Sequence, residues 1–222
     1  MRYKELTFEG RNAVLEAFRS GKTIDKLYIL DGCQDGPVKS IVREAKKTST
    51  IISYVEKERL DRLANTGHHQ GVVAIGAAYE YADVEDILEA ARSKGEDPFI
   101  FILDEIEDPH NLGAIIRTAN LAGAHGVIIP KRRAVGLTAT VAKTSAGAIN
   151  YTPVAKVTNI AATIESLKKE GLWFVCADMG GETMYNLNLK GPIGLVIGNE
   201  GNGVSRLVKE KCDFVASIPM KG

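Results

Sequence analysis

The sequence lacks the features that mark disulfide-rich, zinc-binding, secreted and membrane-spanning proteins. It has three cysteines among 222 residues, Cys33, Cys176 and Cys212, and none belongs to a CxxC pair. This spacing argues against a disulfide framework and a zinc site, and it favours a reducing compartment. No apolar stretch reaches the length of a membrane span, and the opening residues MRYKE do not resemble a signal peptide. We therefore expect a soluble cytoplasmic protein.

An excess of charge of either sign is also absent. The chain has 28 lysines and arginines and 28 aspartates and glutamates, so its formal net charge is zero. Net charge therefore does not indicate a nucleic-acid partner, which would have to be held by local basic patches. Internal repeats and low-complexity tracts are missing as well.

The first third of the chain alternates between helical and strand patterns. We expect helices at 12–18, 38–46 and 58–64, and strands at 26–30, 51–55 and 72–77. Such alternation predicts a small α/β domain, residues 1–77, with helices packed on a sheet. The composition changes over residues 78–97, where we expect a linker that includes a short helix near 84–91.

Residues 98–222 are expected to form a second domain around a buried, mostly parallel sheet. The predicted strands are short and nearly all apolar, as strands covered on both faces are. Strands are expected at 99–103, 126–129, 172–176, 193–197 and 214–218. Helices are expected at 111–123, 138–148, 159–170 and 204–211.

Residues 103–124, LDEIEDPHNLGAIIRTANLAGA, predict the end of a buried strand, a turn and the start of a helix. Asp108 and Pro109 supply the residues of a turn and a helix start. Arg117 lies on the helix near the carboxyl end of the strand, where ligands bind in open α/β sheets. On position alone, a solvated arginine paired with a carboxylate is the simpler interpretation. Apolar residues at helical spacing form the expected inward face: Leu112, Ile115, Ile116, Ala119 and Ala122.

A second stretch, GLVIGNEGNGV at 194–204, predicts a buried strand, a glycine-rich turn that carries Glu200, and a helix start. The simplest interpretation is a tight connection in which glycines supply positive φ angles. A dinucleotide loop is disfavoured, because the order here is GxxGxG in the last turn, and a Walker lysine is absent. A basic triplet follows the strand at 126–129 and is either a solvated loop or a phosphate contact: Lys131, Arg132 and Arg133.

Together the two stretches resemble the SpoU (TrmH) branch of the SPOUT RNA methyltransferases. DPHNLGAIIRTA, with Asn111, Gly113 and Arg117, is similar to the first family motif, and IGNEGNGV with Glu200 is similar to the second. SIPMKG, at 217–222, resembles the start of the third. GRNAVLEA and HHQGVVA resemble the substrate-binding domain of bacterial rRNA ribose methyltransferases.

The resemblance implies a small N-terminal L30e-like α/β domain and a C-terminal parallel-sheet SPOUT domain with an α/β knot. Because the third motif stops at Gly222, before its closing helix, we expect the knot to be incomplete in this chain. The implied activity is methyl transfer from S-adenosylmethionine to a ribose 2′-hydroxyl of RNA, a guanosine of 23S rRNA being the first choice. A tRNA ribose methyltransferase and a non-catalytic RNA-binding ribosome-assembly factor remain alternatives. The resemblance also implies a homodimer.

The implied catalytic residues are Asn111, Arg117 and Glu200. A guanidinium is nearly always protonated, so we expect Arg117 to bind the target phosphate and stabilise the 2′-alkoxide rather than act as a base. Glu200 would orient Arg117 or accept the proton through water, and Asn111 would hold the loop or the ribose.

The implied cofactor pocket is built mainly from main chain. Ile218 and Met220 suit an adenine ring, although ordinary core is the simpler interpretation of both. His69 is a candidate for RNA contact, and the pair His68-His69 lacks the third ligand that a zinc site needs, so no metal is expected. The expected cofactor-binding residues are Ala177, Asp178, Met179, Gly198, Asn199, Ile218, Pro219 and Met220. The expected RNA-binding residues are Arg11, Asn12, His69, Lys131, Arg132 and Arg133.

Overall fold

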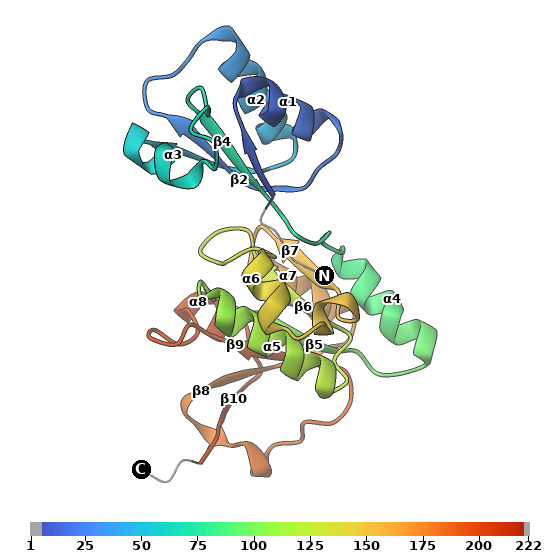
Figure 1. Ribbon diagram of the computed structural model, residues 1–222. Coiled ribbons are helices and arrows are strands. Elements are labelled where there is room, and N and C mark those ends of the chain that lie inside the picture. The colour runs from blue at the N-terminus through green and yellow to red at the C-terminus, as the bar shows by residue number, and fades with distance from the viewer. Residues whose placement is uncertain (1–5, 220–222) are drawn as a thin grey trace. The chain divides into compact units, whose positions relative to one another are not determined.

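The computed structural model describes residues 6–219, which form two compact units (Figure 1). The first unit contains residues up to Glu80 and a short segment, Gly136–Ala139. The second contains Tyr81–Val135 and the residues from Thr140 onward. Each unit has a sheet of its own, with its own hydrophobic core.

A mixed four-stranded sheet forms the first unit, in the order β1-β4-β2-β3. β2 pairs in parallel with β3 and antiparallel with β4, and β4 pairs antiparallel with β1. The strands are β1 (Leu6–Glu9), β2 (Ile24–Leu30), β3 (Ile51–Val55) and β4 (Val72–Gly76). The helices are α1 (Arg11–Arg19), α2 (Gly36–Lys47) and α3 (Lys57–Leu63).

The two faces of this sheet pack against different helices. Leu27 and Ile29 of β2 share one buried cluster with Val14 of α1 and Ile41 of α2. Tyr28, between them, belongs to a separate cluster that includes Leu60 of α3. This is the alternation of side chains that a strand imposes, and it places α1 and α2 on one face and α3 on the other.

The second unit contains a six-stranded sheet in the order β10-β8-β9-β5-β6-β7, and every neighbouring pair is parallel. The predicted α/β class with a parallel sheet is therefore confirmed. The strands are β5 (Phe99–Leu103), β6 (Gly126–Pro130), β7 (Val154–Val157), β8 (Trp173–Thr183), β9 (Ile193–Ile197) and β10 (Phe214–Ser217). The helices are α4 (Val84–Lys94), α5 (Pro109–Leu121), α6 (Ala139–Thr144), α7 (Ile160–Lys169) and α8 (Arg206–Lys209), with short 3-10 turns η1 (Ala148–Asn150) and η2 (Met184–Asn186).

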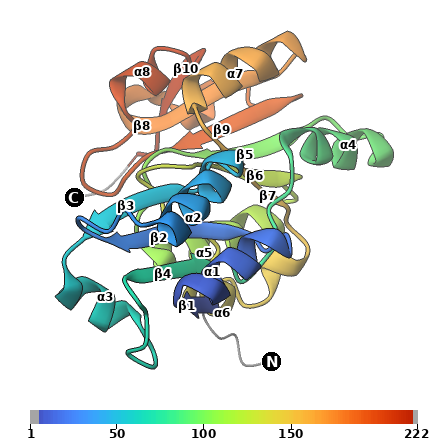
Figure 2. The same cartoon turned by 90° about the horizontal axis from the view of Figure 1, so that it is seen from above.

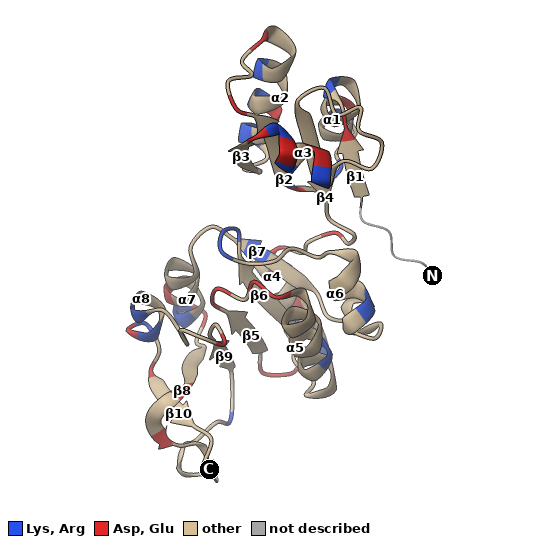
Figure 3. Cartoon of the chain, turned by 60° about the vertical axis from the view of Figure 1, so that its left-hand side comes forward, with Lys and Arg blue, Asp and Glu red and all other residues tan. Residues whose placement is uncertain are grey.

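Helices cover both faces of this sheet, as a parallel sheet requires. Ile87 of α4, Ile164 of α7 and Val208 of α8 pack with Ile100 and Phe174 in one buried cluster. Figures 2 and 3 show α5 and α6 on the opposite side of the strands. Within residues 6–219, no helix combines the length and the apolar character needed to cross a membrane.

Several elements differ from the sequence-based expectation. β1 and β7 were not predicted, and β8 extends to Thr183 instead of ending at 176. α6 is shorter than the predicted helix 138–148, because Ala146 and Gly147 adopt φ angles of 50° and 89° that end it. α8 covers only four residues of the predicted 204–211. The prediction that Ala122 faces inward was wrong, since it is the exposed C-cap of α5.

Candidate active site

The carboxyl ends of β5 and β9 bring the two sequence stretches together. These strands are neighbours in the sheet, with Leu103 paired to Ile197. From β5 the chain continues to β6 and β7 on one side, whereas β9, β8 and β10 lie on the other side. Connections that diverge in this way leave a crevice where ligands bind in open α/β sheets.

The start of α5 is fixed by a cap and a close helix contact. Asp108 accepts hydrogen bonds through Oδ1 from the backbone N–H groups of His110 (2.7 Å) and Asn111 (3.0 Å), and Pro109 occupies the first turn. A Cβ at Gly113 would lie 1.9 Å from Oγ1 of Thr144. Glycine is therefore required in this motif because α5 packs directly against the end of α6.

Asn199 organises the loop that follows β9. Its backbone N–H and C=O both pair with Gly203, and its Oδ1 accepts from the N–H groups of Gly201 (2.8 Å) and Asn202 (3.3 Å). Its Nδ2 donates to the carbonyl of Glu105 (2.9 Å), in the loop after β5. One amide side chain thus shapes one loop and connects it to the next.

The connection at Gly198 is tight, and it explains the first glycine of the second motif. A Cβ at Gly198 would lie 2.1 Å from the backbone carbon of Gly203. Gly203 itself has a φ of 67°, where side chains are strained. The loop therefore needs glycine at both positions, and it holds Glu200 at its tip.

A hydrogen bond links the two predicted motifs. Nδ2 of Asn111 donates to Oε2 of Glu200 at 3.2 Å, across 89 residues of sequence. Arg117 lies about 9 Å further along the helix, given a rise of 1.5 Å per residue. Its side chain is exposed, and within residues 6–219 it has no hydrogen bond or ion pair. Glu200 therefore contacts Asn111 here, and a direct link from Glu200 to Arg117 stays a prediction.

A pocket of about 700 Å³ opens beside Glu200. Three chain segments line it: residues 177–180 of β8, 199–203 after β9, and 216–218 at the end of β10. Among the expected cofactor-binding residues, these lie in its wall: Ala177, Asp178, Met179, Asn199 and Ile218. Gly198 and Pro219 are not among the lining residues, and Met220 lies outside the described residues.

The two largest apolar side chains that line this pocket face solvent and are not core. Met179 is 88% exposed and Ile218 is 66% exposed. The core interpretation of Ile218 is therefore excluded. Exposed apolar side chains on a pocket wall suit an apolar ring of a ligand.

Asp178 anchors the pocket to α8. Its Oδ2 accepts from Nζ of Lys209 at 2.8 Å, and its Oδ1 accepts from the N–H of Met179 at 2.7 Å. The bond from Lys209 lowers the pKa of Asp178 below its ordinary range, and Asp178 raises the pKa of Lys209. Sequence reasoning missed Lys209, because nothing in VSRLVKEK distinguishes it from a solvated lysine.

The basic loop after β6 reaches the same edge of the sheet. Nη1 of Arg133 lies 2.8 Å from Oε1 of Glu105, whose carbonyl holds Asn199. This hydrogen bond raises the pKa of Arg133. Arg132 is exposed and Lys131 is half-buried, so Arg132 presents its charge to solvent beside a constrained neighbour.

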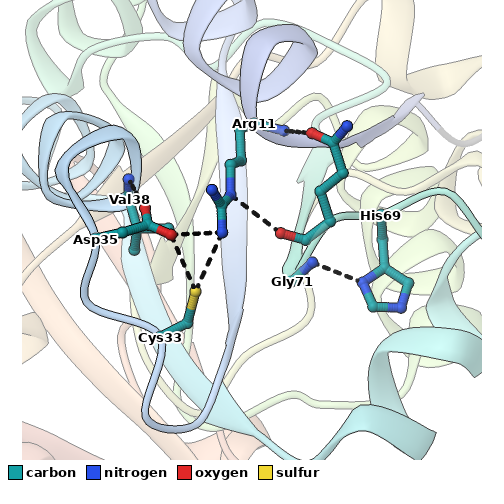
Figure 4. Close-up of polar contacts among 7 residues, drawn as sticks. Arg11, Cys33, Asp35, Val38, His69 and Gly71 are labelled. Atoms are coloured by element: carbon teal, nitrogen blue, oxygen red, sulfur yellow. Dashed lines mark hydrogen bonds and ion pairs between the residues drawn. The ribbon is translucent and has the colours of Figure 1, made fainter.

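In the first unit, Arg11 connects three segments (Figure 4). Its Nη2 lies 2.5 Å from Oδ2 of Asp35 and 3.6 Å from Sγ of Cys33, and its Nε donates to the carbonyl of Gln70 at 3.2 Å. Asp35 is also the N-cap of α2, accepting from the N–H of Val38 at 3.1 Å. Arg11 is thus held in place, while its neighbour Asn12 is exposed.

His69 is buried, with an exposed fraction of 6%. Its Nδ1 accepts from the N–H of Gly71 (3.0 Å), so Nε2 carries the proton and donates to Oδ1 of Asp61 (2.9 Å). Both ring nitrogens are occupied by the protein. This geometry gives His69 a structural role, and we leave it out of the RNA-binding residues proposed below.

A parallel α/β sheet with a ligand-sized pocket and an anchored carboxylate at its carboxyl edge defines a ligand-binding α/β protein. In the described part of the chain, no three His, Cys, Asp or Glu side chains are arranged to hold a metal ion. Residues 98–222 match the model of the SpoU rRNA Methylase family, and residues 8–82 match the model named RNA 2′-O ribose methyltransferase substrate binding. The chain belongs to the SpoU rRNA methylase family.

Relatives and solved structures agree with this assignment. A Bacillus subtilis (strain 168) protein named "Putative TrmH family tRNA/rRNA methyltransferase YacO" is 52% identical over 214 residues, which are 96% of this chain and 86% of that protein. The SpoU methyltransferase AviRb from Streptomyces viridochromogenes, solved with the cofactor AdoMet, superposes with a TM-score of 0.58 at 22% identity, over 98% of this chain and 82% of that one. An AdoMet-bound rRNA methyltransferase from Sinorhizobium meliloti gives a TM-score of 0.55 at 23% identity, over 98% and 79% of the two chains. The two structural matches show a shared fold.

Proposed function

We propose that this protein transfers a methyl group from S-adenosylmethionine to the ribose 2′-hydroxyl of a guanosine in 23S rRNA. The observation that carries the proposal is the hydrogen bond from Asn111 to Glu200, a residue that lines the pocket of about 700 Å³. It joins the helix that carries Arg117 to the loop that walls the pocket. Membership of the SpoU rRNA methylase family supports a methylase, and the match of residues 8–82 supports an RNA substrate.

The residues of the pocket fit S-adenosylmethionine. The volume of the pocket lies within the range of about 300–1,000 Å³ that is usual for small-molecule sites. Gly180, Gly201 and Gly203 in its wall leave main-chain groups accessible, while Met179 and Ile218 offer apolar surface for an adenine ring. When bound there, the cofactor supplies an electrophilic methyl group on a sulfonium.

The chain's own residues then position the hydroxyl and stabilise charge. The Arg117 guanidinium, which has no partner within residues 6–219, binds the target phosphate and stabilises the developing alkoxide. Glu200 accepts the hydroxyl proton through water, and Asn111 holds that carboxylate in place. An arginine is a poor base, which is why the carboxylate receives the proton.

RNA binding is shared between the two units in this proposal. Arg11 and Asn12 at the start of α1 contribute from the first unit, and Lys131, Arg132 and Arg133 contribute from the loop after β6. The net charge of zero leaves affinity for RNA to such local groups. We also propose that the protein works as a homodimer.

A labelled methyl group provides the test. The protein is incubated with tritiated S-adenosylmethionine and either a 23S rRNA transcript or bulk tRNA, and the products are digested to nucleosides. We expect label in 2′-O-methylguanosine from rRNA only. Label in a tRNA nucleoside would establish the tRNA alternative, whose support is the joint tRNA/rRNA name of the relatives. No transfer, together with no heat of S-adenosylmethionine binding in calorimetry, would leave the non-catalytic assembly factor.

A further inference from the structure

A groove on the first unit lies between α2 and the edge strand β3. It encloses about 420 Å³, and β3 is an outer strand of its sheet. Apolar Val38 and Val42 of α2 form part of the wall, and Tyr54 of β3 stands opposite with 54% of its surface exposed. The remaining lining residues are Cys33, Gln34, Lys39, Arg43 and Lys46.

Three cations follow the groove along α2. Lys39, Arg43 and Lys46 are spaced four and three residues apart, which places them on one helix face over about 10 Å. All three are exposed, and in the described ranges none has an ion pair. The acid of this helix, Glu44, is paired with Lys47 at 2.8 Å. The α2 side of the groove therefore carries a row of three positive charges without acidic partners.

The groove also contains an aromatic ring, Tyr54, which the binding of an anion alone would not require. It lies on the same face of β3 as Ile52, which packs against the core beneath α1 and α2. Tyr54 projects beyond this core, and a large aromatic ring beside a basic stripe is how proteins stack an unpaired base while binding its phosphates. An acidic peptide would use the cations and leave the ring without a role.

We propose that the α2–β3 groove binds single-stranded RNA, with phosphates on Lys39, Arg43 and Lys46 and a base stacked on Tyr54. The inference rests on the proposed function for RNA as the natural substrate. The groove adjoins Arg11, whose Nη2 lies 3.6 Å from Sγ of the lining residue Cys33, and it extends the RNA path along the first unit.

The test measures binding of a fluorescent 12-nucleotide oligoadenylate to the full protein as salt is varied. Changing Lys39, Arg43 and Lys46 together to Ala should weaken binding about 10-fold or more, and should reduce the slope of log K against log salt by about 2, since each lost contact to a single strand removes about 0.7. Tyr54→Ala should weaken binding roughly 5- to 100-fold, and Tyr54→Phe should preserve it.

A matched control lies on the opposite face of the same sheet. α3 carries Lys57, Arg59 and Arg62 among acids (Figure 3), so their joint replacement by Ala removes the same charge elsewhere. We expect little change in the slope from this triple variant. Equal effects of the two triple variants would overturn the proposal. So would weakening by the α2 triple without any effect of Tyr54→Ala, because the groove would then take an anion without a stacked base.

Cys33 supplies an independent readout in the unmodified protein. It lines the groove, and its side chain is half-buried. The oligoadenylate should slow maleimide modification of Cys33 in the parent and should not slow it in the variant that lacks Lys39, Arg43 and Lys46. Equal rates at Cys33 of the parent with and without RNA would contradict the proposal.

The same variants separate this inference from the proposed function. Groove-dependent RNA binding without methyl transfer would remove the proposed function and keep the groove. Methyl transfer by the parent, with all groove variants binding oligoadenylate as the parent does, would remove the groove alone. Calorimetry with S-adenosylmethionine should give parental affinity for every groove variant.

Discussion

At the scale of single residues, the proposed mechanism depends most on the guanidinium group of Arg117. We predict that Arg117→Lys lowers the single-turnover rate of methyl transfer about 10²–10³-fold, as removal of one oxyanion donor does. A lysine retains the charge but loses the planar fork that binds a phosphate through two N–H groups. Arg92→Lys, at an exposed arginine of α4 outside the site, serves as the control. A rate near that of the parent would remove Arg117 from the catalytic residues.

Glu200 has two separable properties, its shape and its charge. Glu200→Gln retains a carbonyl oxygen that can accept from Asn111, so the loop should keep its structure. We predict a loss in single-turnover rate of about 10²-fold, the lower range for acid–base groups, with an unchanged melting temperature. Glu210→Gln, at the exposed end of α8, controls for loss of a nearby charge. An unchanged rate in Glu200→Gln would mean that Glu200 only holds Asn111.

At the scale of secondary-structure elements, the apolar runs at 99–103 and 193–197 are predictable because strands inside a parallel sheet are covered on both faces and need no polar alternation. The later part of β8, DMGGET, is polar and rich in glycine, and it becomes a strand only through pairing with β10. β7 is a four-residue edge strand directly after Pro153, too short for a pattern. Local sequence therefore identifies elements with an intrinsic signal and misses those that depend on a partner.

The candidate site divides in the same way. The sequence predicted that both motifs lie at strand ends of one parallel sheet, but the partner it gave Glu200 was Arg117, whereas the observed partner is Asn111. The contacts of Asn199 with Glu105 and of Asp178 with Lys209 depend on which loops lie side by side. Neither the composition nor the spacing of the motifs indicates which loops are adjacent.

The loop after β9 should lose its shape without Asn199. We predict that Asn199→Ala lowers the free energy of unfolding by about 1–3 kcal/mol, because it leaves polar backbone groups unpaired. Trp173, the single tryptophan, lies in β8 and reports unfolding of the second unit. Asn199→Asp keeps both acceptor bonds and loses the donor to Glu105, so it should fall between the parent and Asn199→Ala. Equal stability of all three would show that the loop is held by other groups.

The ion pair between Asp178 and Lys209 should make stability depend on pH. The pKa of Asp178 is lowered in the folded protein by the bond from Lys209. Its contribution is therefore complete above the unfolded-state pKa of about 3.9 and is lost as the pH falls through the lower folded value. We predict that Asp178→Asn is less stable than the parent at pH 7, and that the difference shrinks below about pH 4. Denaturant titrations followed at Trp173 check this, and a difference independent of pH would contradict it.

At the scale of the whole molecule, the equal numbers of basic and acidic residues, 28 of each, do not reveal local clusters of one sign, such as the three cations along α2. Residues 136–139 belong to the first unit by their contacts, although they lie far from the rest of that unit in the sequence. Neither feature can be recognised in a short stretch of sequence. The proposed boundary within 78–97 and the proposed homodimer also depend on long-range contacts, which local sequence patterns predict poorly.

The homodimer can be tested through the site itself. Leu121, Tyr151 and Leu207 are large apolar side chains exposed in the second unit, and burying such surface favours association with a second copy. Arg117 has no contact with Glu200 of its own chain in the described residues. A dimer in which each site combines Arg117 of one protomer with Glu200 of the other would satisfy both observations.

We predict that Arg117→Ala and Glu200→Gln, each nearly inactive, recover activity when the two variant chains are refolded together. Random assembly makes half of the dimers mixed, and each mixed dimer has one intact composite site out of two, so about a quarter of parental activity should return. Sedimentation should give twice the chain mass of 24.0 kDa for every sample. A dimer without recovery would place both residues of a site on one chain, and a monomer with parental activity would exclude the shared site altogether.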